Sequence, residues 1–335
     1  MKAIVLKELG GAFVLDDIAK PEPGEGEVLI RIAAAALNHR DLWIKQGKYF
    51  LKEYPCVLGS DGAGIVESVG AGVSEELTGN KVVINPALHW GPRRHGHGKD
   101  FQILGMPTQG TFAEYICVPA ENVYPIPIGL SFEKAATLPL AGLTAYRAMF
   151  YRGGLKRGEK ILITGIGGGV ASFLLSFGVK TGALTYVSSS SQEKIQQAVS
   201  LGAMNGVLYT AENWTDLLLE MEPEGFDLVI DSAGGPEFLQ LLKLLRTGGK
   251  IVNFGGTAGK IPEMVPAQLF WKQASILGTT MGSPIDFEQM LSFVTEYIVT
   301  PIVDRVFPME EVQAAFDHMQ NQSQFGKIVL RIADI

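Results

Sequence analysis

Cysteine is scarce in this sequence. The 335 residues contain two cysteines, Cys56 and Cys117, which lie far apart and in no spacing typical of a metal site. Two such residues cannot build a disulfide framework, so we expect a protein of a reducing compartment.

Long apolar runs and clusters of basic residues are missing as well. No stretch of about 18 apolar residues occurs, because Pro139, Gly142 and Arg147 interrupt the most apolar segment. The opening residues, MKAIVLKELGG, have no apolar core or cleavage site typical of a secretory signal. The net charge is −7, and no basic cluster suggests a nucleic-acid surface. We therefore expect a soluble, cytoplasmic protein with no membrane and no nucleic-acid partner.

Two patterns divide the chain. Up to about residue 125, short apolar runs at 3–6, 28–35, 65–69 and 82–85 and an alternating stretch at 111–118 predict a β-rich domain. Helices are expected at 132–138 and 142–151, separated by Pro139. From residue 160 onward, apolar runs at 161–164, 184–187, 206–208, 226–231, 249–254 and 275–278 alternate with helical segments. This alternation predicts a parallel sheet with helices on both faces.

The segment KILITGIGGGVAS, residues 160–172, is the strongest candidate for a cofactor site. A short apolar strand leads into Gly165, Gly167, Gly168 and Gly169. Val170 stands where the pattern has its third glycine, and the chain continues from there as a helix. Glycines let the backbone approach a pyrophosphate, and N–H groups at a helix start point at its negative charge. An ordinary strand-to-helix turn is the alternative, and the next segment favours the cofactor site.

The end of the next expected strand favours NADP over NAD. An NAD site places Asp or Glu on the ribose about 20 residues after the first glycine. Here Ser188 and Ser189 stand 23 and 24 residues after Gly165, with Lys194 just beyond. Hydroxyls and an ammonium group can receive a 2′-phosphate, and no carboxylate repels it. The serines could instead cap the following helix, and both roles can hold. We expect NADP(H) as the cofactor.

The order of motifs along nearly the whole chain resembles the medium-chain dehydrogenase/reductase family. The motifs include PCVLGSDGAGIVESVGAGV, LPLAGLTAYRAM, KILITGIGGGVAS, FDLVIDSAGG, GGKIVNFGG and FGKIVLRI. The resemblance implies an α/β fold with a GroES-like β-rich catalytic domain at 1–125, completed by about 300–335. It also implies a Rossmann doubly wound parallel-sheet domain at 126–299 that binds NADPH, and a homodimer through the edge of that sheet near 275–282.

Zinc-dependent members of this family carry zinc ligands at positions matching Asn38, Ser60 and Asp61. Neither Asn38 nor Ser60 is a plausible zinc ligand. A second zinc in such members is held by four cysteines in a lobe that matches residues 89–108, which contain no cysteine here. The histidines of that lobe are expected to be solvated. The chain thus resembles the zinc-independent, quinone oxidoreductase-like branch, and no metal site is expected.

The resemblance also places the remaining site residues. Asn38 is expected to face the site and donate its amide to the substrate oxygen, where negative charge develops during hydride transfer. Asp41 is expected to line the same site, although an exposed carboxylate at a helix start is equally compatible. Further cofactor contacts are expected, from the resemblance or from the carboxyl ends of strands, at Thr144, Tyr209, Phe254, Gly255, Gly256, Met281 and Lys327. Lys327 is expected to reach the pyrophosphate, and Tyr209 the 2′-phosphate.

These features predict an NADPH-dependent oxidoreductase that reduces quinones or α,β-unsaturated carbonyl compounds by hydride transfer without zinc. An enoyl-thioester reductase of the same branch is one alternative. A cofactor-binding structural or RNA-binding relative without turnover is another, and the acidic balance of the chain disfavours RNA.

Overall fold

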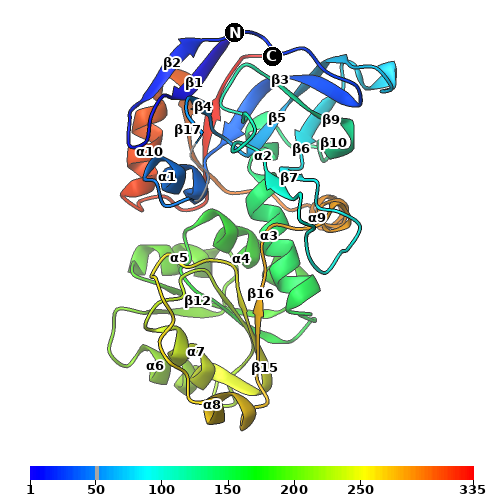
Figure 1. The fold of residues 1–335 in the computed structure, drawn as a ribbon. Coiled ribbons are helices and arrows are strands. Elements are labelled where there is room, and N and C mark those ends of the chain that lie inside the picture. Colours follow the sequence, from blue (N-terminus) through cyan, green and yellow to red (C-terminus); the bar gives the residue numbers. More distant parts are fainter. Residues whose placement is uncertain (50–52) are drawn as a thin grey trace. The chain divides into compact units, whose positions relative to one another are not determined.

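The computed structural model of the protein describes residues 1–49 and 53–335. The chain divides into two compact units (Figure 1). The first unit contains residues 1–143 and 282–335, and the second contains residues 144–281. In sequence, helix α3 (Leu143–Tyr146) crosses from the first unit to the second. None of the helices among the described residues is long and apolar enough to cross a bilayer.

The first unit is built around a seven-stranded sheet. The strand order is β10 (Val123–Pro125), β6 (Lys81–Ile84), β5 (Asp61–Val69), β3 (Glu27–Ala36), β18 (Lys327–Arg331) and β17 (Val303–Pro308), and β9 (Tyr115–Pro119) also pairs with β3. The long strand β3 is central, because its first half pairs with β9 and its second half with β18. The C-terminal strand therefore lies beside a strand from the beginning of the chain.

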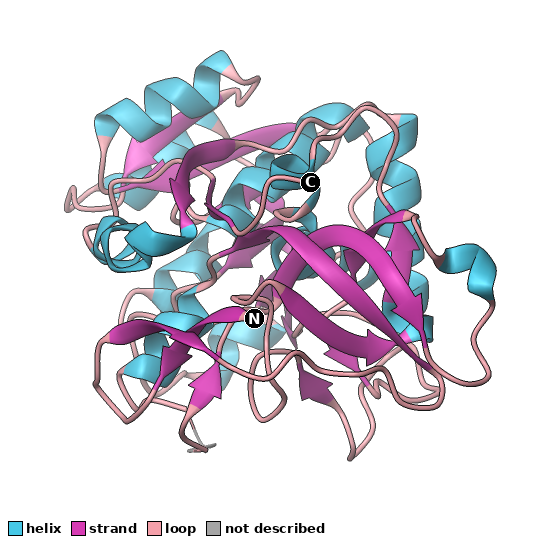
Figure 2. Ribbon diagram, turned by 90° about the horizontal axis from the view of Figure 1, so that it is seen from above, coloured by secondary structure: helices cyan, strands magenta, loops and turns pink. Residues whose placement is uncertain are grey.

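Two smaller sheets and several helices complete the first unit. One sheet has the order β2 (Phe13–Asp17), β1 (Lys2–Leu6), β4 (Cys56–Val57), and the other pairs β7 (Ala87–Leu88) with β8 (Gln102–Ile103). The helices are α1 (His39–Lys45), α2 (Phe132–Ala135), α9 (Pro284–Glu296) and α10 (Val312–Gln320), with short turns η1 (Glu75–Leu77), η2 (Ala120–Asn122), η3 (Leu138–Gly142) and η5 (Met309–Glu311). Figure 2 shows the strands in magenta and the helices in cyan.

The second unit contains a six-stranded parallel sheet. Its order is β13 (Asn205–Leu208), β12 (Leu184–Ser189), β11 (Lys160–Ile163), β14 (Phe226–Asp231), β15 (Leu245–Asn253) and β16 (Ser275–Gly278). The helical segments are η4 (Arg147–Arg152), α4 (Gly169–Thr181), α5 (Gln192–Ser200), α6 (Trp214–Met221), α7 (Phe238–Leu244) and α8 (Pro266–Phe270). Helices cover both faces of the sheet (Figure 1). The strand order reverses between β11 and β14, and such a switch point is where open α/β sheets bind ligands.

The predicted α/β class and all six predicted strands of the parallel sheet are confirmed, with small shifts of their ends. The predicted strand at 111–118 is displaced to Tyr115–Pro119, because Thr111 and Phe112 donate their N–H groups to Gly59 and Leu58 instead. Pro139 does not separate two helices. It stands at the start of the π-helical turn η3, where its missing N–H costs no helical hydrogen bond.

Strands β2 and β17 were not predicted. Both lie at the edges of their sheets and carry charged residues, such as Asp16 and Arg305, that hide the apolar alternation of a strand.

Residues 126–143 and 282–299 belong to the first compact unit, whereas the sequence analysis places them in the parallel-sheet domain, and those domain bounds stay a prediction. Two hydrogen bonds join these segments to other parts of the first unit. Leu140 donates its N–H to Asp61 Oδ1 over 2.8 Å. Arg94 Nε donates to the buried Asp286 Oδ1 over 2.9 Å at the start of α9.

Candidate functional site

The glycine-rich turn joins β11 to α4 at the switch point of the parallel sheet. Gly165 and Gly167 have φ angles of 66° and 120°, which residues with side chains rarely adopt. Gly168 is the N-cap of α4, and no side chain caps this helix. A Cβ atom at Gly168 would meet nothing within 4 Å, so the space in front of the helix is open. This geometry suits a bound phosphate, whose charge the helix N-terminus stabilises.

The end of β12 is bonded to this turn. Ile166 donates its N–H to Ser188 O over 2.8 Å, and the Ser189 hydroxyl donates to Ile166 O over 3.4 Å. Both serine side chains are buried. Ser191 is the N-cap of α5 and accepts from the Lys194 N–H over 3.4 Å. Ser191 therefore caps α5, as the alternative expects. Ser189 instead connects the end of β12 to the glycine turn by its hydrogen bond to Ile166.

Lys194 lies against the glycine turn. A Cβ atom at Gly167 would be 2.7 Å from Lys194 Cδ and 3.0 Å from its Nζ. Tyr209 follows β13, its N–H donates to Ser189 O over 3.0 Å, and its side chain is exposed. An ammonium group and a phenol thus flank the end of β12, where a 2′-phosphate is expected, and their contact with a cofactor stays a prediction.

A buried carboxylate ties together the carboxyl ends of three neighbouring strands, and sequence reasoning missed it. Asp231 Oδ1 accepts from the Thr164 hydroxyl over 2.9 Å. Asp231 Oδ2 accepts from Asn253 Nδ2 over 2.9 Å and from the Gly234 N–H over 2.8 Å. Phe254 donates its N–H to Asp231 O over 3.1 Å. The acidic residue that ends the apolar run FDLVID was the available signal, because ligand sites form at such strand ends.

The remaining predicted cofactor residues of the second unit occupy different environments. Gly255 packs tightly, because a Cβ atom there would lie 2.5 Å from Ser232 O, whereas Gly256 faces open space. Thr144 and Met281 are buried, and Met281 has a φ of 44°. Gly169 and Val170 are the first residues of α4, as expected. The cofactor contacts of all these residues stay predictions.

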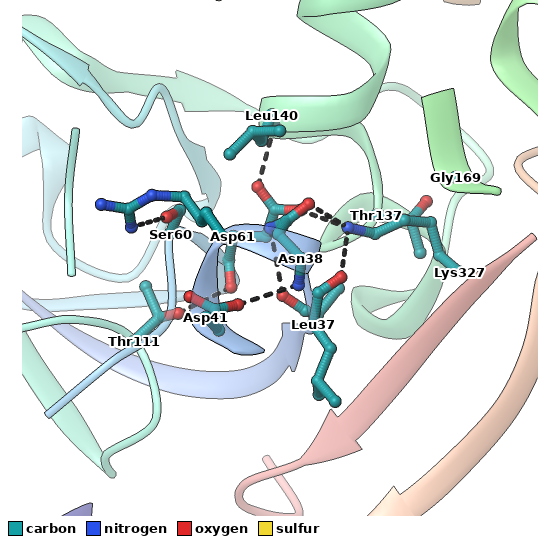
Figure 3. A network of polar contacts seen from close by, with 12 residues as sticks. Leu37, Asn38, Asp41, Ser60, Asp61, Thr111, Thr137, Leu140, Gly169 and Lys327 are labelled. Carbon is teal, nitrogen blue, oxygen red and sulfur yellow. Dashed lines mark hydrogen bonds and ion pairs between the residues drawn. The ribbon is translucent and has the colours of Figure 1, made fainter. Parts of the chain in front are cut away.

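A buried polar cluster forms in the first unit where β3 ends and β5 and β18 begin (Figure 3). Lys327 Nζ donates to Leu37 O and Asn38 Oδ1 over 2.7 Å and to Asp61 Oδ2 over 2.8 Å. Asn38 Nδ2 donates to Asp61 Oδ2 over 3.0 Å and makes a 3.5 Å contact with Ala36 O. The Lys327 side chain is 3% exposed and the Asp61 side chain is fully buried.

This arrangement bears on the predicted roles of Asn38 and Lys327. One N–H of the Asn38 amide is directed at Asp61, while the other has only the long contact with Ala36. Donation by Asn38 to a substrate oxygen therefore rests on the second N–H. All three N–H groups of the Lys327 ammonium have acceptors in the first unit, so none is left to donate to a pyrophosphate. The predicted contact of Lys327 with the pyrophosphate stays a prediction.

Asp41 is fully buried and is not an exposed helix-start carboxylate. Its Oδ2 accepts from the Asn38 N–H over 2.8 Å at the start of α1, and its Oδ1 is buried without a hydrogen-bond partner. Burial raises the pKa of Asp41 to about 6, against the opposing effects of the Arg40 charge and the Asn38 hydrogen bond. Burial also lowers the pKa of His39, and the charge of Lys327 adds to this effect.

Arg40 is a second residue that sequence reasoning missed. Its guanidinium donates to Ser60 Oγ over 2.7 Å and to Leu104 O over 2.9 Å, while its Nε is buried without a partner. Ser60 Oγ donates to the same Leu104 O over 2.8 Å. The signal of its burial in the sequence was its position: Arg40 stands directly before Asp41, and the apolar segment LWI follows Asp41.

Known proteins are similar to this chain over its whole length. Residues 24–128 match the family described as "Alcohol dehydrogenase GroES-like domain", and residues 165–296 match "Zinc-binding dehydrogenase". The "Zinc-type alcohol dehydrogenase-like protein YogA" of Leptosphaeria maculans is 36% identical over 95% of this chain and 94% of its own. The chain belongs to the medium-chain dehydrogenase/reductase family. We call the first unit, which contains residues 24–128, the GroES-like unit, and the second, which contains the six-stranded parallel Rossmann sheet, the Rossmann unit.

Two solved structures of this family are similar to the chain. One is titled "Crystal Structure of NAD-dependent alcohol dehydrogenase", with a TM-score of 0.93, 35% identity, and coverage of 99% of this chain and 100% of that one. The other is the quinone oxidoreductase from Thermus thermophilus, solved also with NADPH, with a TM-score of 0.80, 29% identity, and coverage of 99% and 100%. The protein is thus an oxidoreductase of this family, whose members use NAD(P)H.

The family description names zinc, but the residues of the polar cluster do not fit a zinc ion. The side chains of Asn38, Ser60 and Asp61 offer an amide, a hydroxyl and one carboxylate, with no thiolate and no imidazole. The Lys327 ammonium already lies between the oxygens of Asn38 and Asp61. In the part of the chain that the structure describes, no group of three His, Cys, Asp or Glu side chains could hold a metal ion.

Proposed function

We propose that this protein is an NADPH-dependent reductase of quinones or α,β-unsaturated carbonyl compounds that works without zinc. The observation that carries the proposal is the combination of an intact glycine turn with a polar cluster that contains an ammonium group between its oxygens. Membership of the family supplies the reaction class, and these residues narrow it.

Reduction of such substrates needs a hydride and a way to stabilise the charge on the carbonyl oxygen. Bound NADPH would supply the hydride. The protein would contribute hydrogen-bond donors held in place before the reaction, which is the largest effect in many enzymes. Asn38 is the proposed donor, because its amide plane is fixed by Lys327 and Asp61 and one N–H has only a 3.5 Å contact.

Residues at the end of β12 support NADPH rather than NADH. Similar structures are titled with either cofactor, so these residues must decide. Ser188 and Ser189 end this strand without a carboxylate, and the Lys194 side chain lies on Gly167 beside it. An ammonium close to the turn favours a ligand with an additional phosphate.

The test is a fluorescence titration of NADPH and NADH against the wild type, Lys194→Ala and the control Lys180→Ala. Lys180 is an exposed lysine at the end of α4. We expect Lys194→Ala to weaken NADPH binding by about tenfold or more, which is about 1.4 kcal/mol, and to leave NADH unchanged. Equal binding of both cofactors by the wild type would contradict the choice of NADPH.

A turnover screen with quinones, enones, enals and enoyl thioesters then tests the substrate class. Reduction of quinones or enones by the metal-free protein is the expected result. Preferential reduction of enoyl thioesters would favour the alternative reductase. Tight NADPH binding without turnover of any of these compounds would favour a cofactor-binding protein that is not an enzyme.

The partner that we propose is a second copy of this chain, joined through β16. This strand ends the parallel sheet and pairs on one side with β15. Ile276 in the strand is 37% exposed, and nearby Phe270 and Trp271 are 59% and 77% exposed. An exposed strand edge with apolar neighbours is a site for pairing with another chain.

A further inference from the structure

The Lys327 ammonium has a complete set of hydrogen bonds. An ammonium group has three N–H donors. The structure gives it three acceptors, Leu37 O, Asn38 Oδ1 and Asp61 Oδ2, all at 2.7–2.8 Å. The side chain is 3% exposed, so water does not replace any of these contacts. All the hydrogen bonds and the ion pair of the Lys327 ammonium therefore lie inside the GroES-like unit.

The three acceptors are the kind of oxygens that bind hard metal cations. Two are carbonyl oxygens, from a backbone and an amide, and the third belongs to a carboxylate. They belong to different parts of the chain, because Leu37 and Asn38 follow β3 while Asp61 begins β5. Three such oxygens around one point form a cation site. The Lys327 ammonium is the cation that occupies it.

The other contacts of the cluster hold the acceptors in place. Leu140 donates its N–H to Asp61 Oδ1 over 2.8 Å, and the Thr111 hydroxyl donates to Asp61 O over 2.7 Å. Asn38 turns its oxygen to Lys327 and its Nδ2 to Asp61, which fixes the orientation of the amide. A buried carboxylate of this kind requires a partner charge, because desolvation of an unpaired ion is expensive.

We propose that Lys327 is the resident cation of this site, which keeps metal ions out and positions the Asn38 amide. It is a positioning residue, since it acts through Asn38. The inference goes beyond the proposed function and rests on it only for the turnover readout. It also differs from a role of Lys327 at the pyrophosphate, because that role predicts a loss of cofactor binding.

Metal binding is the first test, and it does not require activity. Lys327→Met keeps the stem of the side chain and removes the charge, and Lys327→Met/Asp61→Asn removes both charges of the pair. Mn²⁺ is the probe, measured by calorimetry and by its effect on Tm. We expect Mn²⁺ to bind Lys327→Met and raise its Tm, and to leave the wild type and the double variant unchanged. Equal Mn²⁺ binding by wild type and Lys327→Met would overturn the inference.

Folding of the variants is itself informative. Lys327→Met leaves the Asp61 carboxylate buried and unpaired, so its Tm should fall, and adding Asp61→Asn should restore part of the loss. If Lys327→Met does not fold while the double variant does, the unpaired Asp61 carboxylate is what prevents folding, which supports the pairing, and the second test uses the double variant. A double variant that is less stable than Lys327→Met would contradict the pairing.

The second test separates positioning from cofactor binding. In the folded variant we expect the Kd for NADPH to stay within about twofold of the wild-type value. The kcat for reduction of the quinone or enone should fall by about tenfold or more. A rise of about tenfold in the Kd for NADPH would show instead that Lys327 contacts the cofactor. If the wild type reduces no quinone or enone, the proposed function fails, and the Mn²⁺ measurements still decide the role of Lys327.

Discussion

The carboxylate of Asp61 and the ammonium of Lys327 form a buried ion pair of 2.8 Å between residues 266 positions apart in the sequence. The register of the sheet produces this pair. Ala36, at the end of β3, pairs with Asp61 on one side and with Val329 on the other. Strands from three parts of the chain thus bring a carboxylate, an amide and an ammonium to one point, which the spacing of residues along the sequence could not show.

The stability of the protein should depend on pH through Asp41. Its folded pKa of about 6 lies above the ordinary aspartate value of 3.8, so the protonated carboxyl is favoured in the folded state. The stabilisation is complete below pH 3.8 and is lost as the pH rises through 6. Asp41→Asn should therefore become more stable relative to the wild type by about 2 kcal/mol between pH 4 and pH 8. Urea denaturation at several pH values measures this difference.

Asp100→Asn provides the matched control, because Asp100 is exposed in the 89–108 lobe. Its stability relative to the wild type should change little over the same pH range. In Asp41→Asn the new amide can still accept the Asn38 N–H through its carbonyl oxygen, so the start of α1 is retained. A difference between Asp41→Asn and wild type that is independent of pH would contradict the assigned pKa.

The open space at Gly168 allows cofactor binding to be separated from folding. The residue has an ordinary negative φ of −74°, and an added Cβ would meet nothing within 4 Å. Gly168→Ala should keep the wild-type Tm within about 2 °C, because no atom must move. The methyl group would enter the space in front of α4, so the Kd for NADPH should rise by about tenfold.

Gly96→Ala is the control for this change, since Gly96 also has open space and lies in the 89–108 lobe. It should alter neither Tm nor cofactor affinity. A normal Kd in Gly168→Ala would place the pyrophosphate away from the glycine turn. A large fall in Tm would show that Gly168 is required for the fold.

Much of the Rossmann unit was predictable, because local patterns carry its architecture. Buried parallel strands such as Phe226–Asp231 are continuous apolar runs, and the glycines at 165 and 167 have the positive φ angles that their turn requires. The motifs of the GroES-like unit identified its family, but edge strands such as β2 escaped because their charged residues interrupt the pattern.

The polar cluster was only partly predictable. Asn38 and Asp41 were expected at the site because of their place in the motif, yet burial of Asp41 depends on the packing of the whole unit. The partners of Lys327 depend on how β18 pairs with β3, a contact between the two ends of the chain. Asp231 could have been found from its place at a strand end, but its three donors come from residues that are separate in sequence.

Removal of the Asp231 carboxylate should weaken the Rossmann unit. Asp231→Ala leaves Thr164, Gly234 and Asn253 without an acceptor that they now share, at a cost of about 2–3 kcal/mol. Asp231→Asn keeps one acceptor oxygen and can donate to the Thr164 hydroxyl, so it should cost about 1 kcal/mol. Denaturant unfolding of the two variants measures both values, and equal losses would argue against the hydrogen-bond network.

The proposed dimer can be tested at the edge of the parallel sheet. Ile276 is 37% exposed in β16, the last strand of the sheet. Lysine at this position would place a charge in a two-stranded contact between copies, and such charges prevent edge pairing. Light scattering after size exclusion should give twice the 36.1 kDa chain mass for the wild type and a single chain mass for Ile276→Lys.

Ile128→Lys is the matched control, because Ile128 is 94% exposed in the other unit and its substitution should leave the dimer intact. A monomeric wild type, or a dimer that survives Ile276→Lys, would rule out pairing through β16.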